Sequence, residues 1–264
     1  MAGVVPSPAA DGAALLRAVP GWRIVDDRLP GSARERLDRD AQLLEAVRKG
    51  TAPPTARIWD NSRCIVAARS ERVLPGLEAA RRELAARGWP LLVRESGGTA
   101  VPHAPGILHL SLAFRPPERP LCTLESAYGA LGLPLLRTLA RLGVPATFGD
   151  APGSFCDGRF NLLVGGRKVA GTAQRWRARP GSAAAARGAV LAHALLLVHG
   201  DVREWTDVVN AFYAAAGASR SHDPDASVTV AECLGDESDV AVERVRGVLS
   251  EELEALLTSP VSPA

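Results

Sequence analysis

The sequence predicts an α+β fold in which a largely antiparallel or mixed sheet is flanked by helices. Strand-like and helix-like segments are interleaved, without the regular strand, helix, strand order of a doubly wound protein. A β-hairpin is indicated where Gly165 and Gly166 join two strand-like runs. At 264 residues, 47% of them hydrophobic and 23% charged, the chain can form one compact core. We expect a flexible arm over residues 1–20, a single domain over 21–258 and a tail over 259–264.

The first expected helix is marked at both ends. Ser32 and Glu35 stand in the positions of a capping box, and Gly50 is a stop signal, so the helix is predicted over residues 32–49. The short apolar runs "ARIWD" and "RCIVAA" come next and predict two strands joined by Asn61-Ser62.

The middle of the chain repeats this mixture. Leucines one heptad apart predict a helix over 75–87, which leads into the strand "PLLVRES". The run "GILHLSLAF" at 106–114 alternates apolar with small or polar residues and predicts another strand. Residues 124–143 predict one helix or a pair of helices, interrupted near Gly132 and Pro134.

The hairpin follows, with "RFNLLV" as its first arm and "RKVAGTAQRW" as its second. Phe160, Leu162 and Val164 occupy alternate positions, so we expect the first arm to bury one face against a helix. The remaining expected elements are a strand at 190–198, a helix at 202–216, a short strand at 227–232 and a helix near 237–257.

Charge and hydropathy limit the classes of partner. Lys+Arg 31 against Asp+Glu 29 gives a net charge of +2, which does not indicate a nucleic-acid partner. The N-terminal stretch lacks a positive region, and prolines and an aspartate break its apolar residues, so neither a signal peptide nor a membrane span is expected. The longest apolar run, at 189–198, is about half of what a bilayer requires. We therefore expect a cytoplasmic protein with no membrane partner, whose thiols stay reduced.

The four cysteines are far apart, without a C-x-x-C pair or a histidine at metal-ligand spacing, so no zinc or other metal site is expected. Cys64, Cys122 and Cys233 are interpreted as inert packing residues. Cys156 differs because it lies in "GDAPGSFCDGRF", a stretch rich in glycine that also contains a proline. Such a stretch predicts a loop tip, where the thiol would be exposed.

Lys168 follows Cys156 in the second arm of the hairpin. The thiolate is the reactive form of cysteine, and a nearby cation lowers the thiol pKa. If the loop folds back over the hairpin, Lys168 would stabilise the thiolate and could hydrogen-bond the carbonyl oxygen of an acyl group attached to it. The alternative on spacing alone is a structural cysteine and a solvated lysine.

The segment "SGGTA" at residues 96–100 joins two expected strands. Residues without bulk let a ligand approach the backbone and let N–H groups point at a carbonyl or an anion. Arg94 could be anchored at the end of the preceding strand. The alternative is a tight glycine turn with a surface arginine. The segment does not match a Walker-type phosphate loop.

The histidines suggest no hydrolase. His103 closely follows the glycine loop and could act as a base or contact a donor, or it could be an ordinary loop histidine. His109 and His193 lie within apolar strands and are interpreted as core residues, whereas His199 and His222 are expected in loops. Because no G-x-S-x-G elbow is present, a serine hydrolase is not supported.

Taken together, the glycine loop and the lysine hairpin resemble the biotin/lipoate protein ligase and octanoyltransferase superfamily. Its signatures are R-x-S-G-G-x-A-V followed by G-x-L-x-x-S, and G-x-K-x-x-G-x-x-Q-R. In this sequence they read Arg94-Glu95-Ser96-Gly97-Gly98-Thr99-Ala100-Val101, Gly106-Ile107-Leu108-His109-Leu110-Ser111, and Gly166-Arg167-Lys168-Val169-Ala170-Gly171-Thr172-Ala173-Gln174-Arg175. The resemblance spans roughly residues 40–215.

This resemblance implies the fold of the superfamily's catalytic domain and an acyl exchange in two steps. With its cysteine in the loop before the hairpin, the sequence most resembles one branch of the superfamily. The enzymes of that branch move octanoyl from the glycine cleavage H protein to lipoyl domains of 2-oxoacid dehydrogenases. Cys156 would carry an octanoyl or lipoyl thioester, and Lys168 would lower its pKa and hold the acyl carbonyl, with neither ATP nor a cofactor. The residues implied to line a narrow apolar acyl tunnel are Arg94, Ser96, Gly97, Gly98, Ala100, His103, Gly171, Thr172 and Ala173.

Three alternatives stay open at this point. The acyl donor could be an octanoylated acyl carrier protein in place of the H protein. The chain could be an ATP-dependent lipoate-protein ligase, which would form an adenylate and not need Cys156. It could also be a non-catalytic module that binds lipoyl domains without transferring a group.

Overall fold

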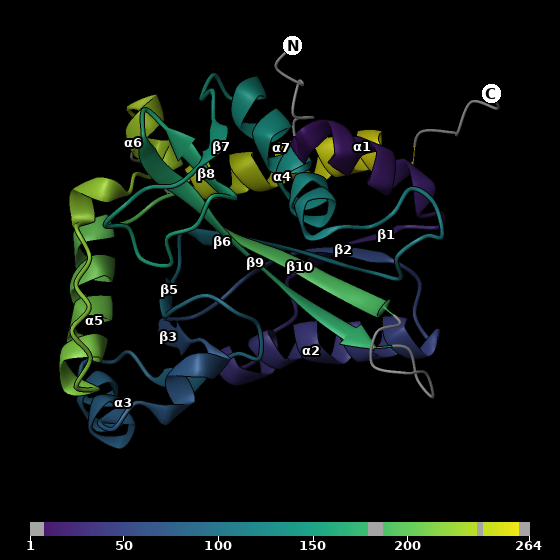
Figure 1. Ribbon diagram of the computed structural model, residues 1–264. Coiled ribbons are helices and arrows are strands. Elements are labelled where there is room, and N and C mark those ends of the chain that lie inside the picture. The colour runs from purple at the N-terminus through teal and green to yellow at the C-terminus, as the bar shows by residue number, and fades with distance from the viewer. Residues whose placement is uncertain (1–7, 179–186, 237–239, 259–264) are drawn as a thin grey trace, which may run out of the picture.

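The computed structural model describes residues 8–178, 187–236 and 240–258, and it combines two β-sheets with helices on both sides (Figure 1). The helices are α1 (Pro8–Ala18), α2 (Ala33–Lys49), α3 (Leu77–Ala86), α4 (Leu124–Arg141), α5 (Val202–Ala215), α6 (Val230–Leu234) and α7 (Val240–Leu257), with 3-10 turns η1 (Arg69–Val73) and η2 (Pro224–Ala226). The strands are β1 (Arg23–Asp27), β2 (Thr55–Asp60), β3 (Cys64–Ala67), β4 (Leu91–Val93), β5 (Val101–His103), β6 (Ile107–Phe114), β7 (Thr147–Gly149), β8 (Asn161–Val164), β9 (Arg167–Ala178) and β10 (Arg187–Leu197).

The predicted α+β class is confirmed, and the sheets are mixed but largely antiparallel. The large sheet has the order β1-β2-β6-β10-β9-β8-β7, and the small sheet has the order β4-β3-β5. Only the pairs β1 with β2 and β3 with β4 are parallel among the described strands. The hairpin at Gly165 and Gly166 forms as expected between β8 and β9.

The helices divide the two faces of the large sheet between them. Helices α1, α4 and α7 lie together over one face and α2 lies on the other, while α3 and α5 pack together beside the small sheet (Figure 1). Strand residues such as Ile58, Leu110 and Ala194 point into the core beneath α1, α4 and α7. Leu162 of β8 is fully buried in the same core, so the expected burial of that hairpin arm is confirmed.

The helix signals at Ser32 and Gly50 are confirmed. The Ser32 hydroxyl accepts from the Glu35 N–H, the Glu35 carboxylate accepts from the Ser32 N–H, and Gly50 adopts φ 77° at the C-terminal end. Helix α4 is continuous despite Pro134, whose carbonyl accepts a 2.8 Å hydrogen bond from the Thr138 hydroxyl one turn later. The expected interruption of this helix is therefore absent.

The prediction of a loosely held arm is wrong for residues 8–18, which form α1. Leu15 and Leu16 are buried in the main core, and α1 crosses α4 closely at Gly12 and Gly129. A Cβ at Gly12 would lie 2.1 Å from the carbonyl carbon of Gly129, so only glycine allows this crossing. Residues 1–7 and the expected tail at 259–264 lie outside the described residues.

One further expectation is wrong. The segment expected as a strand at 227–232 makes only a bridge at Ser227 and then enters α6, because the Thr229 hydroxyl caps the Glu232 N–H. The two strands joined by Asn61-Ser62 form, but they belong to different sheets. The short strands β1, β5 and β7 were not anticipated. In the described part of the chain, no helix is long and apolar enough to cross a bilayer.

Candidate active site

The floor of the candidate site is the face of the large sheet that is turned toward α2. Strand register places side chains there in rows that cross β2, β6, β10 and β9. One row consists of Trp59, His109, Leu195 and Gly171, and the next consists of Arg57, Ser111, His193 and Ala173. A pocket with about 790 Å³ of empty space lies over this floor, with Leu37 and Asp40 of α2 in its wall.

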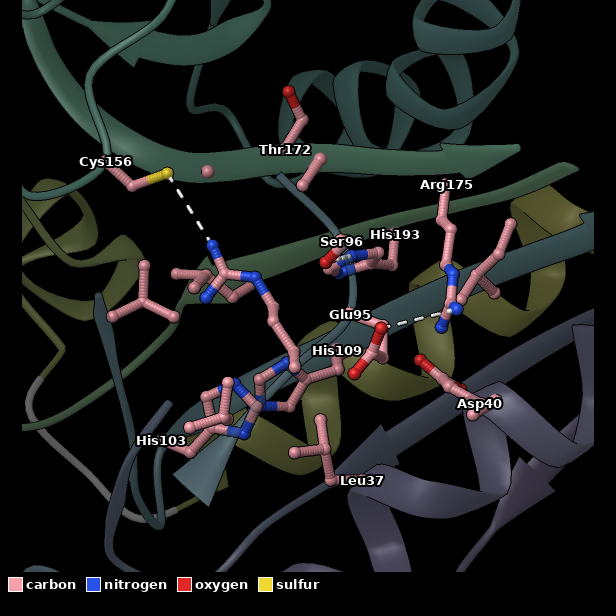
Figure 2. A pocket seen from close by; sticks show the side chains of 18 of the residues that line it. Leu37, Asp40, Glu95, Ser96, His103, His109, Cys156, Thr172, Arg175 and His193 are labelled. Carbon is pink, nitrogen blue, oxygen red and sulfur yellow. Dashed lines mark hydrogen bonds and ion pairs between the residues drawn. The ribbon is translucent and has the colours of Figure 1, made fainter. Parts of the chain in front are cut away.

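Cys156 lies at one end of this pocket, and Asp40 and Arg175 lie at the other (Figure 2). Cys156 lies in the loop before β8 with φ 52°, a conformation that residues other than glycine rarely adopt. Its side chain is only 7% exposed, so the expected exposure at a loop tip is wrong. The loop is covered by the glycine loop at 96–100, whose Thr99 N–H points at the sulfur over 3.4 Å.

Lys168 supports this loop from below. The lysine is fully buried, and its ammonium donates to the main-chain carbonyls of Phe155 and Cys156, the latter at 3.1 Å. The Asn161 amide also donates to the Cys156 carbonyl at 3.0 Å, and its oxygen accepts from the Thr172 N–H at 3.1 Å. Lys168 and Asn161 thus fix the backbone of the Cys156 loop to the hairpin.

The charges around Cys156 favour its thiolate. Burial opposes ionisation, but the positive charges of Lys168 and Arg94 together with the Thr99 N–H outweigh it, so the pKa of Cys156 is lowered. At Cys64 burial dominates over the opposing charge of Arg34 and raises the pKa to about 12. Burial also lowers the pKa of Lys168, to about 8, against the opposing charges of Cys156 and Asp157.

Arg94 connects the glycine loop to the small sheet. Its guanidinium donates to the carbonyls of Val66, Gly97 and Thr99 at 2.8 to 3.0 Å, and it lies 4.0 Å from the Cys156 sulfur. One side chain therefore fixes the loop and adds a positive charge beside the thiolate. The interpretation as a surface arginine is wrong, because Arg94 is 7% exposed.

Two glycines are required by close approach. A Cβ on Gly98, which has φ 93°, would lie 2.6 Å from the Cys156 sulfur. A Cβ on Gly171 would lie 2.9 Å from both Cε and Nζ of Lys168. Gly171 also lines the pocket, so the missing side chain keeps the ammonium close to the space that a ligand would fill.

Histidines make the pocket more polar than the expected apolar tunnel. His193 shares a 2.9 Å hydrogen bond with the Ser96 hydroxyl, and the Asn61 amide contacts His103 Nδ1 at 3.2 Å. His109 stacks on Trp59 with ring centroids 4.3 Å apart, and its Nε2 has no hydrogen-bond partner among the described residues. Burial lowers the pKa of both His103 and His193 to about 3, and it lowers that of His109 well below its ordinary value. All three rings are therefore neutral at physiological pH.

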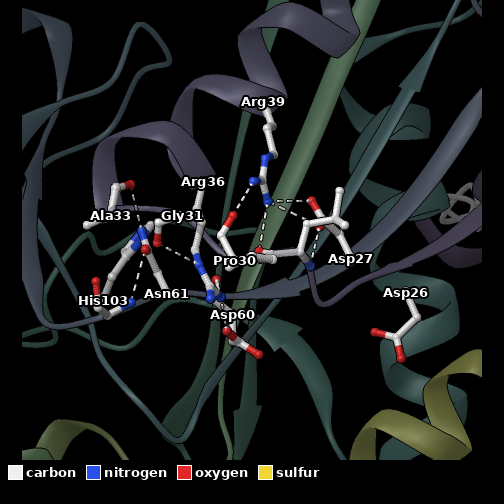
Figure 3. Close-up of polar contacts among 12 residues, drawn as sticks. Asp26, Asp27, Pro30, Gly31, Ala33, Arg36, Arg39, Asp60, Asn61 and His103 are labelled. Carbon is white, nitrogen blue, oxygen red and sulfur yellow. Dashed lines mark hydrogen bonds and ion pairs between the residues drawn. The ribbon is translucent and has the colours of Figure 1, made fainter.

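A buried ion-pair network holds α2 over this pocket. Arg57 of the sheet pairs with Asp40 of α2 at 2.6 Å and with Asp27 at 2.8 Å. Arg39 also reaches Asp27, while Arg36 pairs with Asp60 (Figure 3). Because these contacts join α2 to β1 and β2, the pocket wall is fixed independently of any ligand.

The structure brings together most of the residues predicted from the sequence. Cys156, Arg94, Ser96, His103, Gly171, Thr172 and Ala173 line the large pocket, although His103 does so from strand β5 and not from a loop. Gly97 and Gly98 line a second cavity that also reaches Cys156. Ala100 lines neither cavity, because it is buried and donates its N–H to the Tyr213 hydroxyl. His199 and His222 lie outside the strands and helices, as expected.

Several site residues were missed by sequence reasoning. These are Trp59, Asn161, Glu95, Arg175, and the two histidines taken for core residues, His109 and His193. The signal that could have found the histidines is that both interrupt apolar strands, where a polar ring on the inner face needs a partner or a ligand. Within residues 8–178, 187–236 and 240–258, no cluster of three or more metal-ligating side chains occurs.

Known proteins are similar to this chain in sequence or in fold. Residues 32–254 match the family described as the lipoyl protein ligase A/B catalytic domain. An octanoyl-[GcvH]:protein N-octanoyltransferase of Kyrpidia tusciae is 42% identical over 200 residues, covering 74% of this chain and 67% of that protein. A protein with the same name from Bacillus velezensis is 30% identical over 249 residues, covering 90% and 83%. A solved lipoate-protein ligase A bound with ATP has a TM-score of 0.66 at 21% identity, covering 89% of this chain and 85% of its own.

Proposed function

Because the chain belongs to the family of lipoyl protein ligase A/B catalytic domains, we propose that it is an acyltransferase with a cysteine acyl-enzyme. It moves an octanoyl or lipoyl group, carried as a thioester on Cys156, onto the target lysine of a lipoyl-domain protein. The domain that does so is the one expected over residues 21–258, extended by α1, whose Leu15 and Leu16 share its core.

The observation that carries this proposal is the environment of Cys156. Its sulfur lies at the end of a pocket, receives a backbone N–H and has a lowered pKa although its side chain is buried. Burial of a structural cysteine has the opposite effect, as Cys64 shows. A stabilised thiolate beside a ligand-sized pocket is the arrangement that nucleophilic catalysis needs.

In the first step the Cys156 thiolate attacks the carbonyl carbon of an octanoyl-lysine amide. A C–S bond forms, the C–N bond breaks, and the lysine nitrogen leaves as an amine after taking a proton from the Lys168 ammonium. Lys168 can supply that proton because its pKa, about 8, is near physiological pH. Two of its N–H groups are held by the carbonyls of Phe155 and Cys156, and the third can donate to the developing oxyanion.

In the second step a neutral lysine amine attacks the thioester carbonyl. The new C–N bond forms, the C–S bond breaks, the amine proton returns to Lys168 and the thiolate is regenerated. Since one amide is exchanged for another, the reaction needs no ATP. The acyl chain extends over the floor made by β6, β9 and β10, where Ser96 and the neutral histidines line its path.

The donor that we propose is the octanoylated glycine cleavage H protein, and the acceptors are lipoyl domains of 2-oxoacid dehydrogenases. Two relatives that are at least 30% identical carry names that specify octanoyl transfer from GcvH to protein, which supports this choice. The compartment that we propose is the cytoplasm, because the mechanism requires a reduced thiol.

A transfer assay tests the proposal against the ATP-dependent alternative. Octanoylated H protein and an unmodified lipoyl domain are mixed with the enzyme without ATP, and the octanoylated lipoyl domain is quantified by mass. The wild type should transfer the group, and Cys156→Ser should abolish the transfer. Transfer by both proteins only when ATP and free octanoic acid are supplied would establish a ligase.

A further inference from the structure

A second cavity meets the first at Cys156. It contains about 470 Å³ of empty space and shares Cys156, Thr172 and Ala173 with the large pocket. Its remaining lining residues are Gly97, Gly98, Tyr128, Asp157, Gly158, Arg159, Phe160, Asn161 and Gln174. The nucleophile is thus reached from two directions.

We propose that this second cavity binds the side chain of the substrate protein's lysine, which gives up or accepts the acyl group. The acyl chain and the amine then approach Cys156 through separate spaces. This inference rests on the acyl-enzyme mechanism proposed above. It assigns an alkylammonium-binding role to Tyr128, Asp157 and Phe160.

The shape of an acyl-enzyme requires two spaces. The thioester carbon is bonded to the Cys156 sulfur and to the acyl chain, which occupies one direction from the sulfur. An attacking amine must approach the carbonyl carbon from above or below the plane of the thioester group, and its own alkyl stem must extend away from the acyl chain. The large pocket accommodates the chain, and the second cavity offers the amine a separate space beside Cys156.

The wall of the second cavity is suited to a lysine stem. Tyr128 of α4 stacks on Phe160 with ring centroids 4.5 Å apart and 14° between the planes. Arg159 lies 4.7 Å from the Phe160 ring and pairs with Glu125 at 2.9 Å at the exposed rim of the cavity. Stacked rings bind methylene groups, and they attract an ammonium by a cation–π interaction.

The polar groups of the cavity also fit an amine. Asp157 is exposed and lines the cavity next to the nucleophile, so its carboxylate can attract the substrate ammonium. Burial raises the pKa of the Tyr128 hydroxyl, on which the Gln174 side chain and the charge of Cys156 also act. The cavity therefore leads from a carboxylate and an aromatic wall to the sulfur.

Gly158→Trp tests the assignment by filling the second cavity. A Cβ at Gly158 meets no atom within 4 Å, so the substitution fits the local backbone. Gly247→Trp on the exposed side of α7, where a Cβ also meets nothing within 4 Å, is the matched control. Two rates are measured: transfer from octanoylated H protein to a lipoyl domain, and labelling of Cys156 by octyl methanethiosulfonate, which places an octyl chain on the sulfur without a lysine.

Gly158→Trp should lose transfer by about 100-fold, as expected when the reacting amine is displaced, while octyl labelling stays at the wild-type rate. Gly247→Trp should match the wild type in both measurements. Equal transfer by Gly158→Trp and wild type would overturn the assignment, and so would lost labelling, which would place the acyl chain in this cavity. Transfer that survives Cys156→Ser would instead refute the proposed function itself.

A second variant does not depend on filling space. Asp157→Asn on the surface should raise the KM for the lipoyl domain roughly fivefold, the size of an exposed ion pair. It should not slow octyl labelling, because loss of a negative charge beside Cys156 favours the thiolate. An unchanged KM would exclude Asp157 from lysine binding.

Discussion

The ammonium of Lys168 donates a hydrogen bond to the main-chain carbonyl of Cys156, so the cation contacts the backbone of the residue that carries the thiol. The same ammonium lies against Gly171, which lines the large pocket. Lys168 therefore has a structural and an electrostatic role besides the proton transfer proposed above. It fixes the loop that presents the sulfur, and its charge lowers the thiol pKa.

Lys168→Met tests the electrostatic role, because it keeps the length of the side chain and removes the charge. Without the charge of Lys168, less would oppose the effect of burial, so the pKa of the Cys156 thiol should rise by about one unit or more. Alkylation by iodoacetamide, which follows the thiolate fraction, should then shift to higher pH by the same amount. Arg167→Met, on the neighbouring residue whose guanidinium pairs with Glu232, is the control and should keep the wild-type profile. An unshifted profile in Lys168→Met would show that Lys168 is structural only.

Gly98→Ala and Gly97→Ala form a matched pair in the glycine loop. The new Cβ at Gly98 would lie 2.6 Å from the Cys156 sulfur in a backbone conformation of φ 93°, whereas a Cβ at Gly97 meets nothing within 4 Å. We expect Gly98→Ala to reduce acyl transfer by about 100-fold and Gly97→Ala to reduce it far less. Rates of transfer under single-turnover conditions measure both. Equal losses would mean that the loop does not pack on the sulfur as described.

His109→Phe tests the neutral histidines of the pocket. Their pKa values are depressed on folding, so the unfolded chain binds more protons below about pH 6.5, and the free energy of unfolding must fall as the pH drops from there toward about 3. Phenylalanine keeps the stacking on Trp59 and removes both the titration and the unpartnered Nε2.

The gain in stability from His109→Phe should therefore be larger in acid. One such histidine lowers the free energy of unfolding by about 2 kcal/mol at roughly pH 5, because that pH lies about 1.5 units below the pKa of histidine in the unfolded chain. Urea unfolding at about pH 7.5 and pH 5 measures the two gains, with the difference expected near that value. Equal gains at both pH values would show that His109 can be protonated in the folded protein.

Local signals predicted what is decided locally. Ser32, Glu35 and Gly50 mark the ends of α2 because caps satisfy backbone groups within a few residues of each end. The hairpin at Gly165 and Gly166 is specified in the same way. The glycine loop and the lysine hairpin pointed to the family because their spacing is legible in the sequence.

The contacts between segments far apart in the sequence could not be predicted from the sequence. The histidine-lined floor depends on the register of four strands, which places His109 opposite Trp59 and Leu195. The burial of Cys156 depends on the glycine loop, far away in sequence, which covers it. Helix α1 was missed because its proline-rich flank resembles a tail, and its packing on α4 and α7 joins segments far apart in the sequence.

The most direct test of the central claim is the intact mass of the purified protein after mixing with octanoylated H protein without ATP, beside Cys156→Ser. We expect one octanoyl group on the wild type, none on the variant, and loss of the group when an unmodified lipoyl domain is added. An unmodified wild type, or an adduct that persists in Cys156→Ser, would contradict the thioester mechanism.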